Sequence, residues 1–204
     1  MGEVEATARK AARGAGYPWG LADEAGRAAR WLSARGVDGC AALAGLLDAM
    51  DGADLARRSP NAQTGMWQAP EALCPLATGS ALSDRAAEAI RGVRVEEILA
   101  PVLLVPFAAL LTGSARQTVT LSWEGGTAVT NGNGLCLGGT VLARAPWVDL
   151  SPGGKMDAPA EACHRAQPDP RAWDRLNAFA QRTYAPATEA SRRKGAGADA
   201  TDND

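Results

Sequence analysis

Histidine is nearly absent from this chain: among 204 residues, His164 is the only one. A serine or cysteine nucleophile that relies on a histidine base would therefore have to use this residue. His164 directly follows Cys163 in a proline-rich segment, and adjacent side chains seldom point to the same place. The sequence therefore predicts a surface histidine beside a half-buried thiol rather than a catalytic Cys-His dyad.

Closely spaced cysteines and nucleotide-binding loops are also missing. The cysteines form no C-x-x-C pair, whereas zinc sites need convergent soft ligands at short spacing. The segment "NGNG" (131–134) lacks the lysine and following helix of a phosphate-binding loop, and no strand precedes the N-terminal "GAG". We therefore expect no metal and no cofactor. Reduced, buried thiols are predicted for Cys40, Cys74, Cys136 and Cys163.

Long apolar runs and a dominant charge are absent as well. The longest apolar run, 100–111, is too short to cross a bilayer and contains two prolines, so it predicts a core segment and no membrane contact. The net charge of -2 argues against a nucleic-acid partner, because phosphate contacts need clustered Lys and Arg. Residues 1–10 are charged and lack the apolar stretch of a secretion signal, so we expect a cytoplasmic protein.

The first fifty residues predict an all-helical unit. Apolar residues recur at helical spacing over 3–13, over about 21–35, and after Asp38, which is placed to cap a third helix. The next segment, 51–79, is rich in Pro, Gly and polar residues, and we expect a long loop there. A short helix is expected near 83–90.

The middle of the chain predicts a small antiparallel or mixed sheet. The segment "QTVTLSW" alternates apolar and polar residues, with Val119, Leu121 and Trp123 on one face. Gly125 and Gly126 predict a hairpin turn, "NGNG" predicts a second turn, and "VRVEEIL" and "TVLARAPWVDL" predict further strands. The type of the apolar run 100–111 stays open because of Pro106.

Asp169 and Pro170 then predict the start of a final helix, as N-cap and first helical residue. We therefore predict a single α+β domain over residues 1–187: an N-terminal helical unit, the small sheet and a C-terminal helix packing back. Residues 188–204 are small and acidic, and their composition alone predicts a disordered tail.

The richest candidate site lies around "GYPWG" (16–20), directly before a helix. Helix N-termini favour anions, and arginine forks suit carboxylates. We therefore consider Tyr17 and Glu24 as acid/base groups and Arg13, Trp19 and Arg27 as ligand-binding groups. The alternative is structural: the two aromatics fill the corner between two helices, and the glutamate and arginine form a solvated pair.

A similar set of residues recurs near the other end of the chain. Tyr184 and Glu189 are further candidates for proton transfer, and Ser191 and Arg192 for ligand binding. If the two ends meet, both sets form one polar cluster. The alternative is an amphipathic final helix followed by a frayed tail.

The opening "EVEATARKAARGAGYPWGLADEAGRAARWL" and the ending "TYAPATEASRRKGAGADATDND" resemble a bacterial family known only as domain of unknown function 3726. The resemblance spans nearly the whole chain and is most specific at its two ends. It implies that residues 188–204 belong to the domain, contrary to their composition. It implies no activity, cofactor or catalytic residue.

Two functional hypotheses follow from these residues. The first is an enzyme or binding protein for a small, polar, carboxylate-bearing metabolite. The second is a non-catalytic interaction or assembly subunit, with a protein partner or a second copy of the chain, whose six tryptophans and Ala-rich helices would serve an interface.

Overall fold

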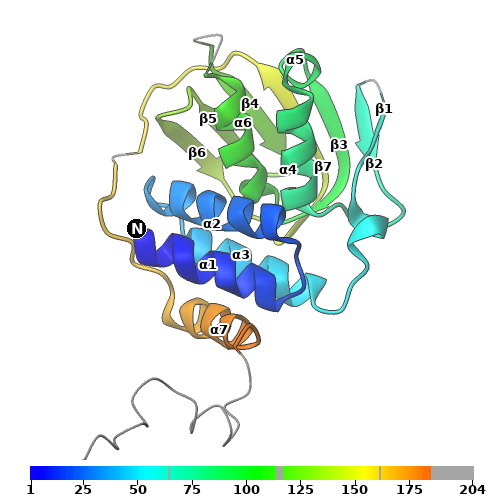
Figure 1. Cartoon of the computed structure of the whole chain (residues 1–204). Helices are drawn as coiled ribbons and strands as arrows, with labels where there is room; N and C mark the ends of the chain where they lie inside the picture. Colours follow the sequence, from blue (N-terminus) through cyan, green and yellow to red (C-terminus); the bar gives the residue numbers. More distant parts are fainter. Residues whose placement is uncertain (64, 114–116, 161, 185–204) are drawn as a thin grey trace, which may run out of the picture.

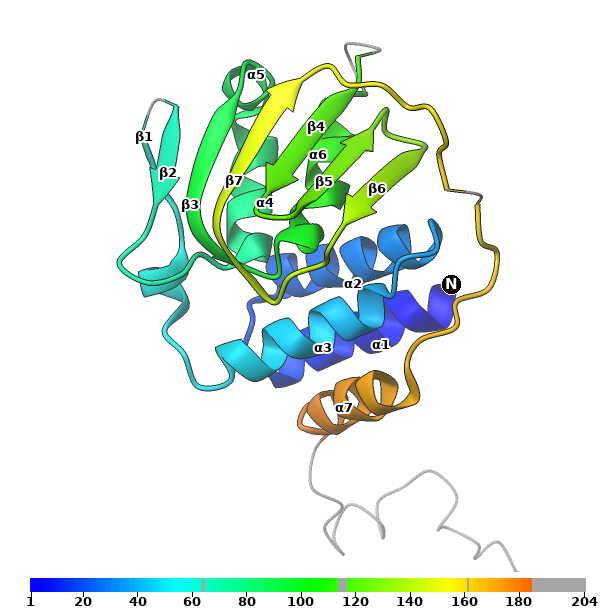
Figure 2. The same cartoon turned by 180° about the vertical axis from the view of Figure 1, so that it is seen from behind.

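The computed structural model describes residues 1–63, 65–113, 117–160 and 162–184 (Figure 1). Its helices and strands confirm the predicted α+β class. The helices α1, α2 and α3 form one layer, and a mixed sheet with α4 and α6 on one of its faces lies beside it (Figures 1 and 2). The last helix, α7, packs against α1 and α3 on the side away from the sheet.

The N-terminal layer forms because its helices carry small residues where they meet. Helices α1 (Gly2–Gly14) and α2 (Trp19–Ser33) begin and end within two residues of the predicted bounds, and α3 (Gly39–Met50) begins directly after its predicted cap. The buried positions of α1 and α2 are mostly alanines, which let the two backbones approach closely. The Asp38 carboxylate caps α3 by accepting the Ala41 N–H at 2.9 Å, as predicted.

The sheet has the order β1-β2-β3-β7-β4-β5-β6 within the described residues. Of the strand pairs in the described part of the chain, β2–β3 is parallel and the others are antiparallel. The strands are β1 (Asn61–Gln63), β2 (Met66–Gln68), β3 (Val93–Leu99), β4 (Val119–Trp123), β5 (Gly126–Thr130), β6 (Leu135–Gly139) and β7 (Arg144–Pro152). The alternation in β4 is confirmed, since Val119, Leu121 and Trp123 are all buried. The hairpin turn after it consists of Glu124 and Gly125, one residue earlier than predicted.

The predicted long loop over 51–79 is wrong. This segment contains a short 3-10 helix η1 (Leu55–Arg58), the strands β1 and β2, and the first half of α4 (Pro75–Asp84). Three-residue strands are too short to show a period, and β2 forms by parallel pairing with the distant β3. The short helix expected near 83–90 is instead the end of α4 followed by α5 (Ala86–Ala89).

The apolar run forms a 3-10 turn, η2 (Pro101–Leu104), that continues into α6 (Val105–Leu111). Pro101 and Pro106 both lie in a first turn, where the missing N–H costs no internal hydrogen bond. Nearly every residue of this run is buried between the sheet and the helices, whereas Leu110 is 64% exposed. No helix in the described ranges is both long and apolar enough to traverse a membrane.

Helix α7 (Pro170–Gln181) begins as predicted, with the Asp169 carboxylate accepting the Ala172 N–H at 3.0 Å. Its Leu176 and Phe179 are fully buried against the N-terminal layer. Two ion pairs join this region to α3 and its C-terminal end. Arg175 of α7 contacts Asp48 of α3, and the two terminal nitrogens of Arg182, directly after α7, donate to Asp51, directly after α3. The helix therefore packs back onto the N-terminal unit.

We expect the docking of α7 to weaken at acid pH. Hydrogen bonding to Arg182 lowers the pKa of Asp51, so this pair stabilises the docked helix above the ordinary aspartate pKa of about 3.9. The contribution is lost as the pH falls through the lowered value. Hydrogen exchange of α7 between about pH 2 and pH 5 should show this loss. Asp51→Asn should remove the pH dependence, whereas Asp174→Asn, at an exposed position of α7, should retain it.

Candidate functional site

The two aromatic residues of "GYPWG" have different surroundings. The Tyr17 side chain is buried, and its hydroxyl lies 3.3 Å from the Cys74 sulfur at the start of α4. The Trp19 side chain is 68% exposed, with the Arg13 guanidinium 4.5 Å from its ring centre. Arg13 also donates a hydrogen bond to the Tyr17 carbonyl. The corner between α1 and α2 is therefore closed by Tyr17 and presents Trp19 to solvent.

Burial governs the electrostatics of the Tyr17–Cys74 pair. Loss of hydration raises the pKa of Tyr17 far above its ordinary value, and the neighbouring Cys74 raises it further. Burial also raises the pKa of the Cys74 thiol, although its hydrogen bond with Tyr17 lowers it in part. Both groups therefore keep their protons at neutral pH.

Glu24 and Arg27 form an ion pair on one wall of a pocket between α2 and α6. Their closest contact, from Nη2 to Oε1, is 2.6 Å, and a second one, from Nε to Oε2, is 3.4 Å. The pocket has a volume of about 340 Å³. The lining is largely apolar and comes from α1, α2 with the residues that follow it, and α6: Glu5, Glu24, Arg27, Ala28, Arg30, Trp31, Ala34, Arg35, Pro106, Phe107 and Leu110.

Arg35 is the lining residue with the most unusual environment. The central carbon of its guanidinium lies over Trp31, 3.7 Å from the ring centre, and the group donates hydrogen bonds to the carbonyls of Trp31, Gly132 and Asn133 at 3.0 to 3.3 Å. Burial lowers the pKa of Arg35, yet a guanidinium stays charged in proteins. Among the described residues no carboxylate forms an ion pair with it.

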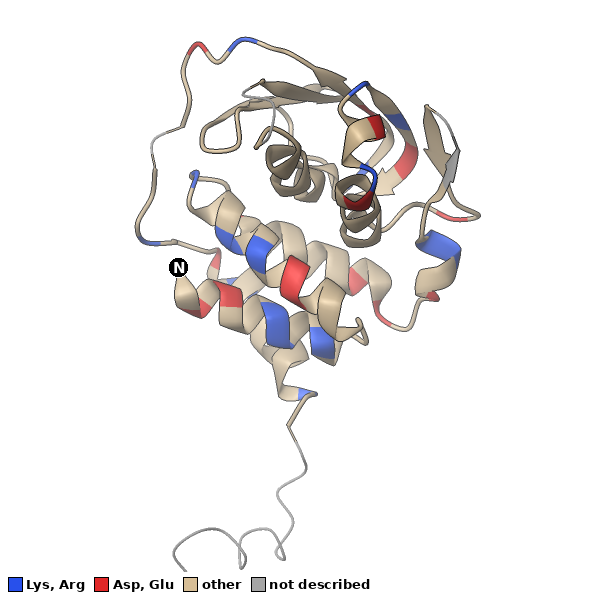
Figure 3. Cartoon of the chain, turned by 45° about the horizontal axis from the view of Figure 1, so that its top comes forward, with Lys and Arg blue, Asp and Glu red and all other residues tan. Residues whose placement is uncertain are grey.

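The charges around the pocket do not cancel. Arg27 pairs with Glu24, and Arg30 pairs with Glu5 at 2.8 Å. Figure 3 shows basic and acidic residues interspersed along the N-terminal helices. Two carboxylates thus face three guanidiniums, and the excess positive charge is that of Arg35. Sequence reasoning missed Arg35 as a site residue, although the spacing of Trp31 and Arg35, one helical turn apart, was a usable signal.

The C-terminal candidates are only partly within the described residues. The Tyr184 side chain is 60% exposed, and the Lys10 ammonium lies 5.8 Å from its ring centre. Tyr17 and Tyr184 therefore have different neighbours, Cys74 in one case and Lys10 in the other. The remaining candidates, Glu189, Ser191 and Arg192, lie outside the described residues.

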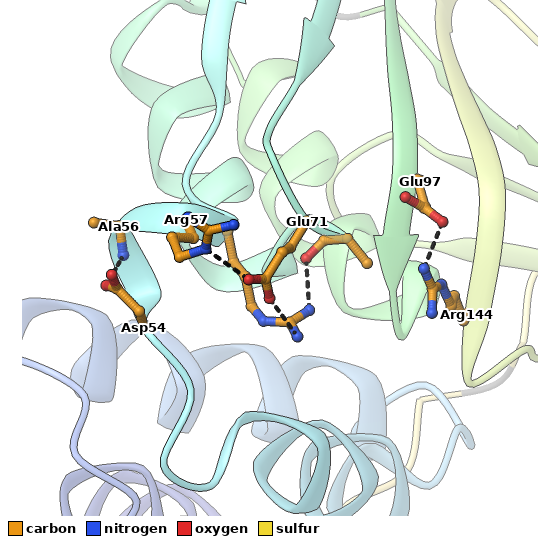
Figure 4. A network of polar contacts seen from close by, with 8 residues as sticks. Asp54, Ala56, Arg57, Glu71, Glu97 and Arg144 are labelled. Carbon is orange, nitrogen blue, oxygen red and sulfur yellow. Dashed lines mark hydrogen bonds and ion pairs between the residues drawn. The ribbon is translucent and has the colours of Figure 1, made fainter.

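A second group of charged residues joins η1 to the segment before α4 (Figure 4). Glu71 accepts from Arg57 at 2.7 Å and pairs with Arg58 at 2.9 Å, and Arg58 also donates to the Ala72 carbonyl. On the neighbouring strands, Glu97 of β3 pairs with Arg144 of β7 at 2.5 Å. Each of these five charged side chains already has a partner, so we assign the group a structural role: the Glu71 pairs join η1 to the segment before α4, and the Glu97–Arg144 pair joins β3 to β7.

The cysteines and the histidine form no obvious reactive centre in the described part of the chain. None of the cysteines is in a disulfide. Cys40 and Cys74 are buried as predicted, whereas the prediction of a buried thiol is wrong for Cys136 and Cys163, which are half-buried. Burial raises the pKa of Cys40 to about 11. No cluster of three or more histidine, cysteine or acidic side chains suited to a metal ion occurs among the described residues.

Comparisons with known proteins identify one family. No curated protein and no solved structure matches the chain. The family match covers residues 1–72, which include α1, α2 and the "GYPWG" corner, but not α6 on the other wall of the pocket. Residues 1–72 match the model of the family described as "Protein of unknown function (DUF3726)", which supports the resemblance at the opening of the chain; the ending that carried the other part of the resemblance lies outside the match.

Proposed function

We propose that this protein binds a small carboxylate-bearing metabolite in the pocket between α2 and α6. The observation that carries the proposal is Arg35, a half-buried guanidinium without a carboxylate partner among the described residues, on the wall of an apolar pocket. A charge in such a place is costly unless it is paired. A ligand carboxylate would supply the missing partner.

The arrangement of Arg35 suits a carboxylate in two respects. The contact with the Trp31 ring and the three carbonyl hydrogen bonds hold the guanidinium in place, so less side-chain freedom is lost when a ligand binds. The guanidinium also has more N–H donors than its three carbonyl contacts use. A planar fork with donors to spare can bind a carboxylate by charge-assisted hydrogen bonds.

The residues predicted from the sequence take secondary positions in this proposal. Glu24 and Arg27 are already paired with each other and would border the ligand. Arg13 and Trp19 lie at the α1–α2 corner and are absent from the pocket lining. We assign binding to this pocket and no chemical step, because its charged side chains are arginines and paired glutamates.

Removing the Arg35 guanidinium should weaken carboxylate binding strongly. We expect Arg35→Gln to weaken binding of propanoate and benzoate at least about tenfold, because hydrogen bonds between charged groups are lost. Chemical-shift titration of the labelled protein would measure it, with thermal melts to check that the variant folds. Arg171→Gln, at an exposed position of α7, should bind as the unaltered chain does.

Two results would count against the proposal. One is equal binding by the Arg35→Gln variant and the unaltered chain, since the carboxylate would then lie elsewhere. The other is the absence of any shift with either acid. In the second case the alternative of an interaction subunit gains support from Leu110, whose side chain is largely exposed at the edge of the pocket.

A further inference from the structure

The pocket has an apolar middle as well as a charged end. From Glu24 to Trp31, the wall formed by α2 extends about 10 Å at the usual helical rise, and Arg35 follows about one turn later. Between the Glu24–Arg27 pair and Arg35, α2 lines the pocket with the apolar residues Ala28 and Trp31. The one charged lining residue on this stretch, Arg30, is paired with Glu5. An elongated ligand along this wall would meet a cation at one end and apolar surface beside it.

The opposite wall belongs to α6 and is apolar throughout. Pro106 and Phe107 line it from the first turn, and Leu110 follows one turn later. Phe107 is only 2% exposed, so its ring forms part of the core, whereas Leu110 is 64% exposed. A leucine that lies so open beside a pocket gains free energy if a ligand covers it.

We propose that the ligand is an amphipathic monocarboxylate, with its carboxylate on Arg35 and its apolar body between Trp31 and Leu110. The inference rests on the proposed function and narrows it to one class of ligand. The single excess positive charge of the lining matches one carboxylate, because the Glu24–Arg27 and Glu5–Arg30 pairs are already neutral. The apolar walls match a hydrocarbon or aromatic body rather than a polar one.

A series of straight-chain acids from acetate to octanoate, at concentrations where octanoate stays monomeric, tests the inference. Each added methylene should tighten binding about two- to fourfold until the apolar walls are covered. Octanol, which has the chain without the charge, should bind at least about tenfold more weakly than octanoate. Binding that does not change with chain length would overturn the inference while leaving the carboxylate site of the proposed function intact.

The variant Leu110→Ser distinguishes the contribution of the apolar wall to binding from that of the Arg35 charge. This variant should lose about three- to tenfold in affinity for octanoate and keep the affinity for acetate, whereas Arg35→Gln should lose both acids. Val141→Ser, at a position 47% exposed and outside the pocket lining, serves as the control and should change neither. Loss of acetate binding in Leu110→Ser would contradict the division of roles between the two walls.

Two further measurements distinguish other occupants of the pocket. Sedimentation of the chain with and without Leu110→Ser detects a second copy seated on α6, and flotation with phosphatidylcholine–phosphatidylglycerol vesicles detects a lipid surface. We expect no change in oligomeric state and no flotation. If Leu110→Ser alters either one while octanoate binding stays the same, the free monocarboxylate is the wrong occupant.

Discussion

Replacing Tyr17 by alanine should lower the free energy of unfolding by about 3–5 kcal/mol, the usual cost of removing a buried aromatic ring. Tyr17 is 3% exposed and belongs to the core at the corner where α1 turns into α2. Its hydroxyl contacts Cys74, so the ring joins the N-terminal helices to the start of α4. Urea unfolding followed by far-ultraviolet circular dichroism would measure the loss.

Two matched variants isolate the causes of this effect. Tyr17→Phe keeps the ring and removes only the contact with Cys74, so it should cost about 1 kcal/mol or less. Trp19→Ala, two residues away, removes a ring that is 68% exposed, and we expect a change within about 1 kcal/mol. If Trp19→Ala destabilised the chain as much as Tyr17→Ala, the corner would not be closed by Tyr17 in the way described.

Replacing Gly14 by alanine should separate α7 from α1. A β-carbon at this position would lie 1.8 Å from the Phe179 carbonyl oxygen, and neither backbone can move without shifting a helix. We expect a loss at or above the upper end of about 1–3 kcal/mol, the usual range for overpacking. Hydrogen exchange of the α7 amides should accelerate more than that of the sheet, because Leu176 and Phe179 lose their contacts.

Gly45 of α3 provides a control of opposite sign. It is exposed, and no atom lies within 4 Å of the position that its β-carbon would take. Gly45→Ala should therefore stabilise the chain by about 0.5–1 kcal/mol, through the better helix propensity of alanine. Equal effects of the two substitutions in thermal melts would show that α7 does not pack on α1 as closely as described.

Local sequence patterns correctly predicted those helices and strands that depend only on residues close together in the chain. The caps of α3 and α7, at Asp38 and Asp169, depend on a side chain and an N–H three residues apart. The alternation of β4 depends only on which face of one strand is buried. The prediction of a loop over 51–79 was wrong because β2 forms by pairing with the distant strand β3, and no local sequence pattern indicates such a pairing.

The candidate site depends on distant pairings to an even greater extent. Glu24 and Arg27 were predicted as neighbours on one helix, and they are. Arg35 matters because the carbonyls of Gly132 and Asn133 and the wall of α6 come to lie beside α2. The position of α6 beside α2 could not be predicted from local patterns, because the sequence did not even decide whether residues 100–111 form a helix or a strand.

The place of β7 in the sheet has a consequence for how the chain is made. This strand lies between β3 and β4, yet it follows both in the sequence, after β5 and β6. During synthesis, β3 and β4 therefore remain unjoined until residues 144–152 have left the ribosome. A nascent chain stalled before that point would present two open strand edges, which are the surfaces that chaperones shield and that aggregation exploits.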